Sequence, residues 1–198
     1  MLTEGKAFEA VSEDADRRTD AFALIQDCLK ASQLDRRQVD CIAVGLGPGS
    51  YTGVRVGISI AQGWQIATGV KLLGVSSADA IAEQAWSEGM RGAVTCAIDA
   101  QRQEFYTCVY ELREDGTRAT QPLRIETLAQ AKERSARGEV IIGPDALPFV
   151  TRQIFPTALA VGTPASTRSD FVAGERLEPI YLREAAFVKA PPPRFVSP

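Results

Sequence analysis

A run of glycines between an apolar segment and a long helical pattern constrains this fold more than any other feature. Residues 39–46 carry a continuous apolar stretch from Cys41 to Val44, which predicts a buried strand. The run Gly45-Leu46-Gly47-Pro48-Gly49-Ser50 follows, and residues 52–68 then predict a helix. Strand, glycine loop and helix in this order are typical of α/β proteins.

The remaining pattern extends this alternation into two parts. We expect an N-terminal lobe over residues 1–92, a C-terminal lobe over 93–189 and a proline-rich tail over 190–198. Asp35-Arg36-Arg37-Gln38 resembles a capping box that opens a single helical turn. The other predicted strands cover residues 6–11, 70–75, 93–99, 104–110 and 140–142, and the other predicted helices cover residues 19–31, 77–88, 127–136, 148–155 and 166–174.

Composition excludes several classes of enzyme. The chain of 198 residues contains no histidine, so it has neither histidine-based acid/base catalysis nor a histidine-ligated metal. Its net charge of -3 lacks the basic excess needed to hold nucleic acid alone. No segment resembles a membrane span or signal peptide, and the four cysteines show no C-x-x-C spacing. We expect a reduced, cytoplasmic protein without a metal.

The glycine loop resembles a phosphate cradle, but its spacing differs from the two common nucleotide motifs. Ser50 stands where the dinucleotide fingerprint needs glycine, and Thr52-Gly53 stands where a P-loop needs Gly-Lys. A structural turn and a phosphate contact both remain open. The residues that would lie near a nucleotide are Gly47, Gly49, Ser50, Arg55 and Asp99, although Asp99 also suits a turn.

Small residues recur at every fourth position of the predicted second helix. Gly49, Gly53, Gly57 and Ala61 therefore lie along one edge, where another element can approach closely. Each interior glycine costs about 1 kcal/mol relative to alanine, so tight packing must offset the loss. The stripe faces either the sheet of this chain or a helix of a partner.

Three segments together resemble a known family. The first is residues 42–77, which contain Gly47-Pro48-Gly49-Ser50-Tyr51-Thr52-Gly53-Val54-Arg55-Val56-Gly57 and Gly74-Val75-Ser76-Ser77. The others are Ile98-Asp99-Ala100-Gln101-Arg102 and Pro179-Ile180-Tyr181-Leu182-Arg183. This combination resembles the TsaB (YeaZ-like) family, with the weakest match over residues 111–175.

The resemblance implies a fold and a role. It implies an actin-like α/β fold of two lobes, related to sugar kinases and Hsp70. It also implies a non-catalytic subunit, with no catalytic residue of its own, that pairs with a TsaD-type catalytic subunit and a TsaE-type ATPase, or with a second copy when alone. That complex uses ATP and a threonylcarbamoyl-adenylate donor to modify the adenosine beside the anticodon of tRNAs reading codons that begin with A. The chain would contact tRNA only through the complex.

The family implies that the first two helices dock on the partner and favours the partner-facing orientation of the glycine stripe. Gly57→Leu is then expected to abolish docking without disturbing the fold. The implied interface residues are Phe22, Ile25, Leu29, Gly53, Val54, Gly57, Ile58 and Ala61.

The chain departs from the family pattern at its start. Family members begin with a strand ending in Asp-Thr-Ser and a second strand hairpinned to it, whereas this sequence opens at what resembles the third strand. We expect a misassigned start or a truncation, which would expose an edge of the first sheet.

Two other functions remain open. One is a weak nucleotide-binding ATPase or a peptidase-like enzyme of the same superfamily, and the other is a self-associating interaction protein unconnected with tRNA.

Overall fold

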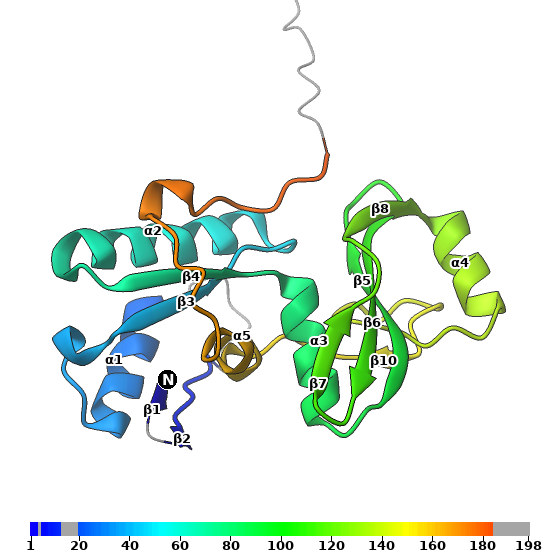
Figure 1. Cartoon of the computed structure of the whole chain (residues 1–198). Coiled ribbons are helices and arrows are strands. Elements are labelled where there is room, and N and C mark those ends of the chain that lie inside the picture. Colours follow the sequence, from blue (N-terminus) through cyan, green and yellow to red (C-terminus); the bar gives the residue numbers. More distant parts are fainter. Residues whose placement is uncertain (4, 13–19, 184–198) are drawn as a thin grey trace, which may run out of the picture.

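The computed structural model describes residues 1–3, 5–12 and 20–183 and shows two main sheets with helices packed on them (Figure 1). The predicted α/β class is confirmed. The helices are α1 (Ala21–Ser32), α2 (Tyr51–Thr68), α3 (Ser77–Ser87), α4 (Leu128–Ala136) and α5 (Ala158–Ala165), with single turns η1 (Arg36–Gln38) and η2 (Gly174–Arg176). The strands are β1 (Leu2–Thr3), β2 (Lys6–Ala7), β3 (Cys41–Gly45), β4 (Lys71–Val75), β5 (Gly92–Asp99), β6 (Glu104–Arg113), β7 (Gly116–Ala119), β8 (Arg124–Thr127), β9 (Ile141–Gly143) and β10 (Arg152–Gln153).

The first sheet consists of β3 and β4, which pair in parallel with Cys41 opposite Lys71. Helix α2 connects the two strands, since parallel neighbours need a crossover, and it covers one face of the sheet. Helix α5 covers the opposite face, where Leu73 and Val75 pack against Ala165. Apolar side chains of β4 are therefore buried on both sides.

Helices in this half begin and end at residues with recognisable caps. The Asp20 side chain accepts hydrogen bonds from Phe22 and Ala23 at the start of α1, and Ser50 accepts one from Gly53 at the start of α2. Gly69 ends α2 in the left-handed conformation, with φ of 76°. The predicted capping box at Asp35 is confirmed.

The second sheet is mixed, in the order β10-β9-β5-β6-β7, with β8 also paired to β6. Its centre is the predicted β5–β6 hairpin, in which Cys96 lies opposite Cys108. Helix α3 packs on one face of this sheet, and α4 packs on the other. Gln101, Arg102 and Gln103 form the hairpin turn with φ values of 63°, 58° and 60°, all in the left-handed region.

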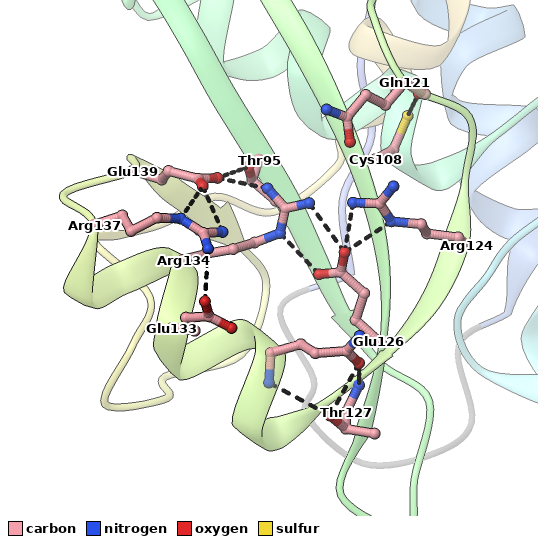
Figure 2. A network of polar contacts seen from close by, with 11 residues as sticks. Thr95, Cys108, Gln121, Arg124, Glu126, Thr127, Glu133, Arg134, Arg137 and Glu139 are labelled. Atoms are coloured by element: carbon pink, nitrogen blue, oxygen red, sulfur yellow. Dashed lines mark hydrogen bonds and ion pairs between the residues drawn. The ribbon is translucent and has the colours of Figure 1, made fainter.

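A network of charges centred on the buried Glu126 and Arg134 links α4 to β8 (Figure 2). The Arg134 guanidinium points between Glu126, at 2.8 and 3.0 Å, and Glu139, at 2.5 Å. Arg124 also pairs with Glu126 at 2.6 Å. Burial alone raises the pKa of Glu126, but the hydrogen bonds from Arg134 and Arg124 outweigh it and lower that pKa below its ordinary value. The network therefore stays ionised near neutral pH.

The end of the described chain returns to the first sheet. Val172 forms an isolated bridge with Leu72, and Leu177 is buried beneath α2. The backbone N–H of Ile180 then donates to the Leu46 carbonyl at 2.9 Å. The chain continues to Arg183, which contacts the Ala100 carbonyl and Glu104 on the β5–β6 hairpin.

These contacts cross the division that the sequence suggests at residue 92. Helix α3, assigned to the first lobe, packs on the second sheet, whereas α5, assigned to the second lobe, packs on the first. The lobe boundaries stay a prediction, and the tail over 190–198 lies outside the described residues.

Local expectations fail mainly after residue 110. The helix predicted over 148–155 is wrong, because that segment contains a turn and the short strand β10. The helix predicted over 166–174 is wrong as well, since the helix lies earlier, at α5, and contains Pro164 near its end. The strand predicted over 6–11 covers only Lys6–Ala7.

Candidate functional site: helix α2 and the adjacent cavity

The glycine loop follows the end of β3 and positions the start of α2. Gly47 has φ of 82°, which favours glycine, and a Cβ there would lie 3.4 Å from Val54 Cγ2. Its carbonyl accepts a hydrogen bond from the N–H of Ser77 at 2.8 Å. The loop is therefore fixed between α2 and the first residue of α3.

A cavity of about 560 Å³ lies where this loop faces the β5–β6 hairpin and the segment 179–181. Four of the five residues predicted near a nucleotide line it, namely Gly47, Gly49, Ser50 and Asp99. The predicted set missed other polar lining side chains, among them Tyr106 and Asp145. Because Asp145 follows a separate strand, no local motif indicated its position.

Asp99 is largely engaged in the hairpin turn. Its carboxylate accepts from the Gln101 backbone N–H at 2.7 Å and from the Gln101 side chain at 2.9 Å. Its own N–H donates to Asp145 Oδ2 at 3.2 Å. The turn role that the sequence left open is therefore present. Among the residues that the structure describes, no group of three potential metal ligands comes together.

Arg55 lies outside the cavity, on the first turns of α2. Its guanidinium carbon is 4.0 Å from the centre of the Tyr51 ring, and its Nε donates to the Tyr181 hydroxyl at 3.0 Å. The hydrogen bond to Tyr181 raises the pKa of Arg55 above its ordinary value. Tyr51 and Tyr181 both line the cavity, so Arg55 packs against the rim residues.

The later part of the glycine stripe, Gly57 and Ala61, faces the sheet of this chain, whereas Gly49 and Gly53 are exposed. A Cβ on Gly57 would lie 3.3 Å from Val44 Cγ2 on β3. Ile58 and Ala61 are buried in the same core, with 5% and 1% of their surface exposed, and Val54 packs against it. This is the orientation that the repeat alone left open, and it differs from the partner-facing one that the resemblance favours.

This geometry corrects the expected effect of Gly57→Leu. A leucine side chain there would run into Val44, so the substitution would disturb the core of the first sheet together with any docking surface.

A second small and apolar stripe occupies the outward face of α2. Val56 is 47% exposed and Ile66 is 88% exposed, and a Cβ on Gly63 would meet nothing within 4 Å. At about 100° per residue these positions share one side of the helix. The other members of this outward face are Thr52, Ser59 and Ala67.

Helix α1 also has one exposed and one buried side. Phe22 is 66% exposed, whereas Leu29 is 6% exposed and Ile25 is half-buried. Of the eight predicted interface residues, Phe22 and Gly53 have exposed positions, and the others are partly or fully covered within the chain. The interface on a partner stays a prediction.

Comparison with known proteins supplies the family. A family described as "TsaD: tRNA N6-adenosine threonylcarbamoyltransferase" matches residues 16–133. The chain is 30% identical over 188 residues to the Escherichia coli K12 "tRNA threonylcarbamoyladenosine biosynthesis protein TsaB", covering 85% of this chain and 81% of that protein. The chain belongs to the TsaB family.

Further TsaB relatives agree with this assignment. The Haemophilus influenzae TsaB protein is 41% identical over 83 residues, which cover 42% of this chain and 35% of that protein. A solved structure titled "YeaZ from Pseudomonas aeruginosa" superposes with a TM-score of 0.72 at 25% identity, covering 91% of this chain and 92% of that one. These matches confirm the predicted actin-like α/β fold for this TsaB family member. None of its described helices combines the length and hydropathy of a membrane span.

Proposed function

We propose that this chain is a non-catalytic subunit of the machinery that makes threonylcarbamoyladenosine in tRNA. Membership of the TsaB family carries the proposal, because the relatives are named for this biosynthesis. The modified base would be the adenosine beside the anticodon of tRNAs that read codons beginning with A. The absence of histidine from the sequence supports a role without histidine-based acid/base catalysis or a histidine-ligated metal.

The chain would act by docking on a TsaD-type catalytic subunit through α1 and α2, with a TsaE-type ATPase completing the complex. The exposed Phe22 of α1 and the uncharged outward face of α2 support this surface. Apolar side chains at the centre of an interface release water on association, and small residues let a second helix approach closely. When alone, the chain would use the same surface for a homodimer in the cytoplasm.

Reconstitution tests the proposal. TsaD-type and TsaE-type proteins, ATP, the threonylcarbamoyl-adenylate donor and unmodified tRNA are combined with and without this chain, and threonylcarbamoyladenosine is measured by mass spectrometry of the digested tRNA. We expect product only with the chain present. Equal product in both reactions would reject the proposal.

Nucleotide binding in the cavity is a second candidate. The cavity of about 560 Å³ lies against Gly47, Gly49 and Ser50 at the start of α2, where N–H groups and the helix dipole favour an anion. Calorimetric titration of the isolated chain with ATP tests it. Saturable binding that weakens in Ser50→Glu would support an ATP-binding subunit, and no heat of binding would leave the scaffold role alone.

A further inference from the structure

Arg55 is the single charged residue among the 18 residues of α2. Three positions separate it from Thr52, so its side chain lies about 60° around the helix from that residue. It therefore borders the outward face, which carries no charge of its own. A lone cation at the edge of an exposed apolar face requires an explanation.

The guanidinium is held in place before any partner arrives. Tyr51 supports its flat face, and Tyr181, from the far end of the described chain, accepts a hydrogen bond from Nε. Nε of Arg55 donates to Tyr181, and no carboxylate among the described residues pairs with its terminal nitrogens, which can therefore donate to an acid of a partner. An arginine fixed in this way loses little conformational freedom on binding.

Some arginines at the surface form ion pairs within the chain, whereas others, such as Arg118, form none among the described residues. Arg152 meets Glu88 at 2.6 Å, Arg168 meets Asp170 at 2.6 Å, and Arg183 meets Glu104. Over residues 1–3, 5–12 and 20–183, Arg55 has no such ion pair. Among the described arginines without an ion pair, Arg55 is the one whose guanidinium is oriented by aromatic rings, those of Tyr51 and Tyr181.

We propose that Arg55 determines the specificity of docking by pairing with one carboxylate of the TsaD-type partner. The inference rests on the proposed function and names one contact within it. Arginine and tyrosine are also the residue types that concentrate binding energy at protein interfaces.

Two other occupants fit the surface less well. An RNA backbone is bound through several cations, whereas α2 offers one on a chain with net charge of -3. Helix α2 contains no carboxylate, so in a second copy the acid would have to come from α1, whose Asp27 already lies 3.8 Å from Lys30 of its own helix. A different protein that carries an apolar face and a single acid fits both observations.

Affinity for the purified TsaD-type partner tests the inference. Calorimetry would compare the wild-type chain with Arg55→Gln and Arg55→Glu at low and high salt. We expect Kd to rise about tenfold for Arg55→Gln and further for Arg55→Glu, because an ion pair is lost or reversed. The salt dependence of Kd should weaken in Arg55→Gln. Arg118→Glu changes an exposed arginine on β7 and should leave Kd unchanged.

A double-mutant cycle tests whether Tyr181 positions Arg55. Tyr181→Phe keeps the ring and removes the hydroxyl that accepts from Nε. We expect a rise in Kd of about threefold in the wild-type background and no rise in the Arg55→Gln background, since coupled residues are not additive. Equal rises in both backgrounds would show that Tyr181 acts independently and would contradict the positioning role.

The outcomes separate the two proposals. If the wild-type chain does not bind the partner, both the docking proposal and the proposed Arg55 contact are rejected. Wild-type binding with unchanged Kd in Arg55→Glu would reject only the role of Arg55. Loss of tRNA binding by the isolated Arg55→Glu chain, with partner affinity intact, would also overturn the inference in favour of RNA. Rescue of Arg55→Glu by changing one partner carboxylate to lysine would establish the pair.

Discussion

The network between β8 and α4 and the outward face of α2 use arginine in opposite ways. Arg134 is 8% exposed and is enclosed by Glu126 and Glu139, so its charge is satisfied inside the chain. Arg55 is exposed and is held by two aromatic rings. The stability of the fold depends on the acids that pair with a buried guanidinium. An exposed guanidinium contributes little to stability and can pair with an acid of another protein.

The largest effect should come from breaking the buried network. Glu126→Leu leaves the Arg134 charge short of its main acid, and we expect the free energy of unfolding to fall by about 3–5 kcal/mol. Urea unfolding followed by circular dichroism measures the change. Glu133→Gln, which removes the exposed partner of Arg137, is the matched control and should cost about 0.5 kcal/mol or less. Similar losses for the two variants would show that the buried ion pairs stabilise the fold no more than the exposed one does.

A pair of glycine substitutions should separate the two faces of α2. Gly57→Leu should lower the free energy of unfolding by about 1–3 kcal/mol, because the side chain meets Val44. Gly63→Leu should raise it by about 1 kcal/mol, because the site is open and leucine favours helix.

The more stable variant, Gly63→Leu, should bind the partner less tightly than the wild-type chain does. Gly63→Leu fills the outward face and should weaken docking on the TsaD-type partner despite its greater stability. If Gly57→Leu is as stable as the wild type in chemical unfolding, our orientation of α2 is incorrect.

Acid should weaken the buried network selectively. The folded-state pKa of Glu126 lies below its ordinary value of 4.5, so its contribution to stability is complete above that pH and is lost as the pH falls through the lowered pKa. Thermal unfolding between pH 7 and pH 3 should show a decline below about pH 4.5 that is shallower in Glu126→Leu. A decline of equal slope in both proteins would assign the acid sensitivity to other groups, such as Glu139 or Asp170.

The smallest effect on stability should come from Arg55. Arg55→Gln removes an exposed charge with no ion pair in the described chain, and we expect a change within about 0.5 kcal/mol. Thermal unfolding checks this, with Arg118→Gln as the control. A loss comparable to that of Glu126→Leu would mean that the stacked arginine supports the fold and would end the contrast between the two sites.

Local signals in the first part of the sequence were sufficient to predict most of its elements. The caps at Ser50 and Asp35 and the apolar run of β3 are encoded by neighbouring residues, so their positions follow from short-range chemistry. Helix α5 contains Gly162 and Pro164, which disfavour helix, and its packing on β3 and β4 decides its structure. Such long-range stabilisation leaves little trace in a local pattern.

The residues of the site could be predicted from the sequence, but not which face of α2 packs against the sheet. The sequence identified α2 and Arg55, but both sides of the helix carry small residues, Gly57 and Ala61 inward and Gly63 and Ala67 outward. The contact of Gly57 with Val44 and the burial of Ala61 distinguish the two sides, and both are visible only in the folded structure. The pairing of Glu126 with Arg134 was equally hidden, because it forms when β8 and α4 meet in space.

The return of residues 172–183 to the first sheet has a consequence for synthesis on the ribosome. Helix α2 and strands β3 and β4 leave the exit tunnel early, yet Val172, Leu177 and Ile180, which complete their packing, are translated much later. Contacts so distant in sequence form slowly, because a long loop must close first. The core of the first sheet in the nascent chain therefore stays incomplete until residues 172–183 have emerged.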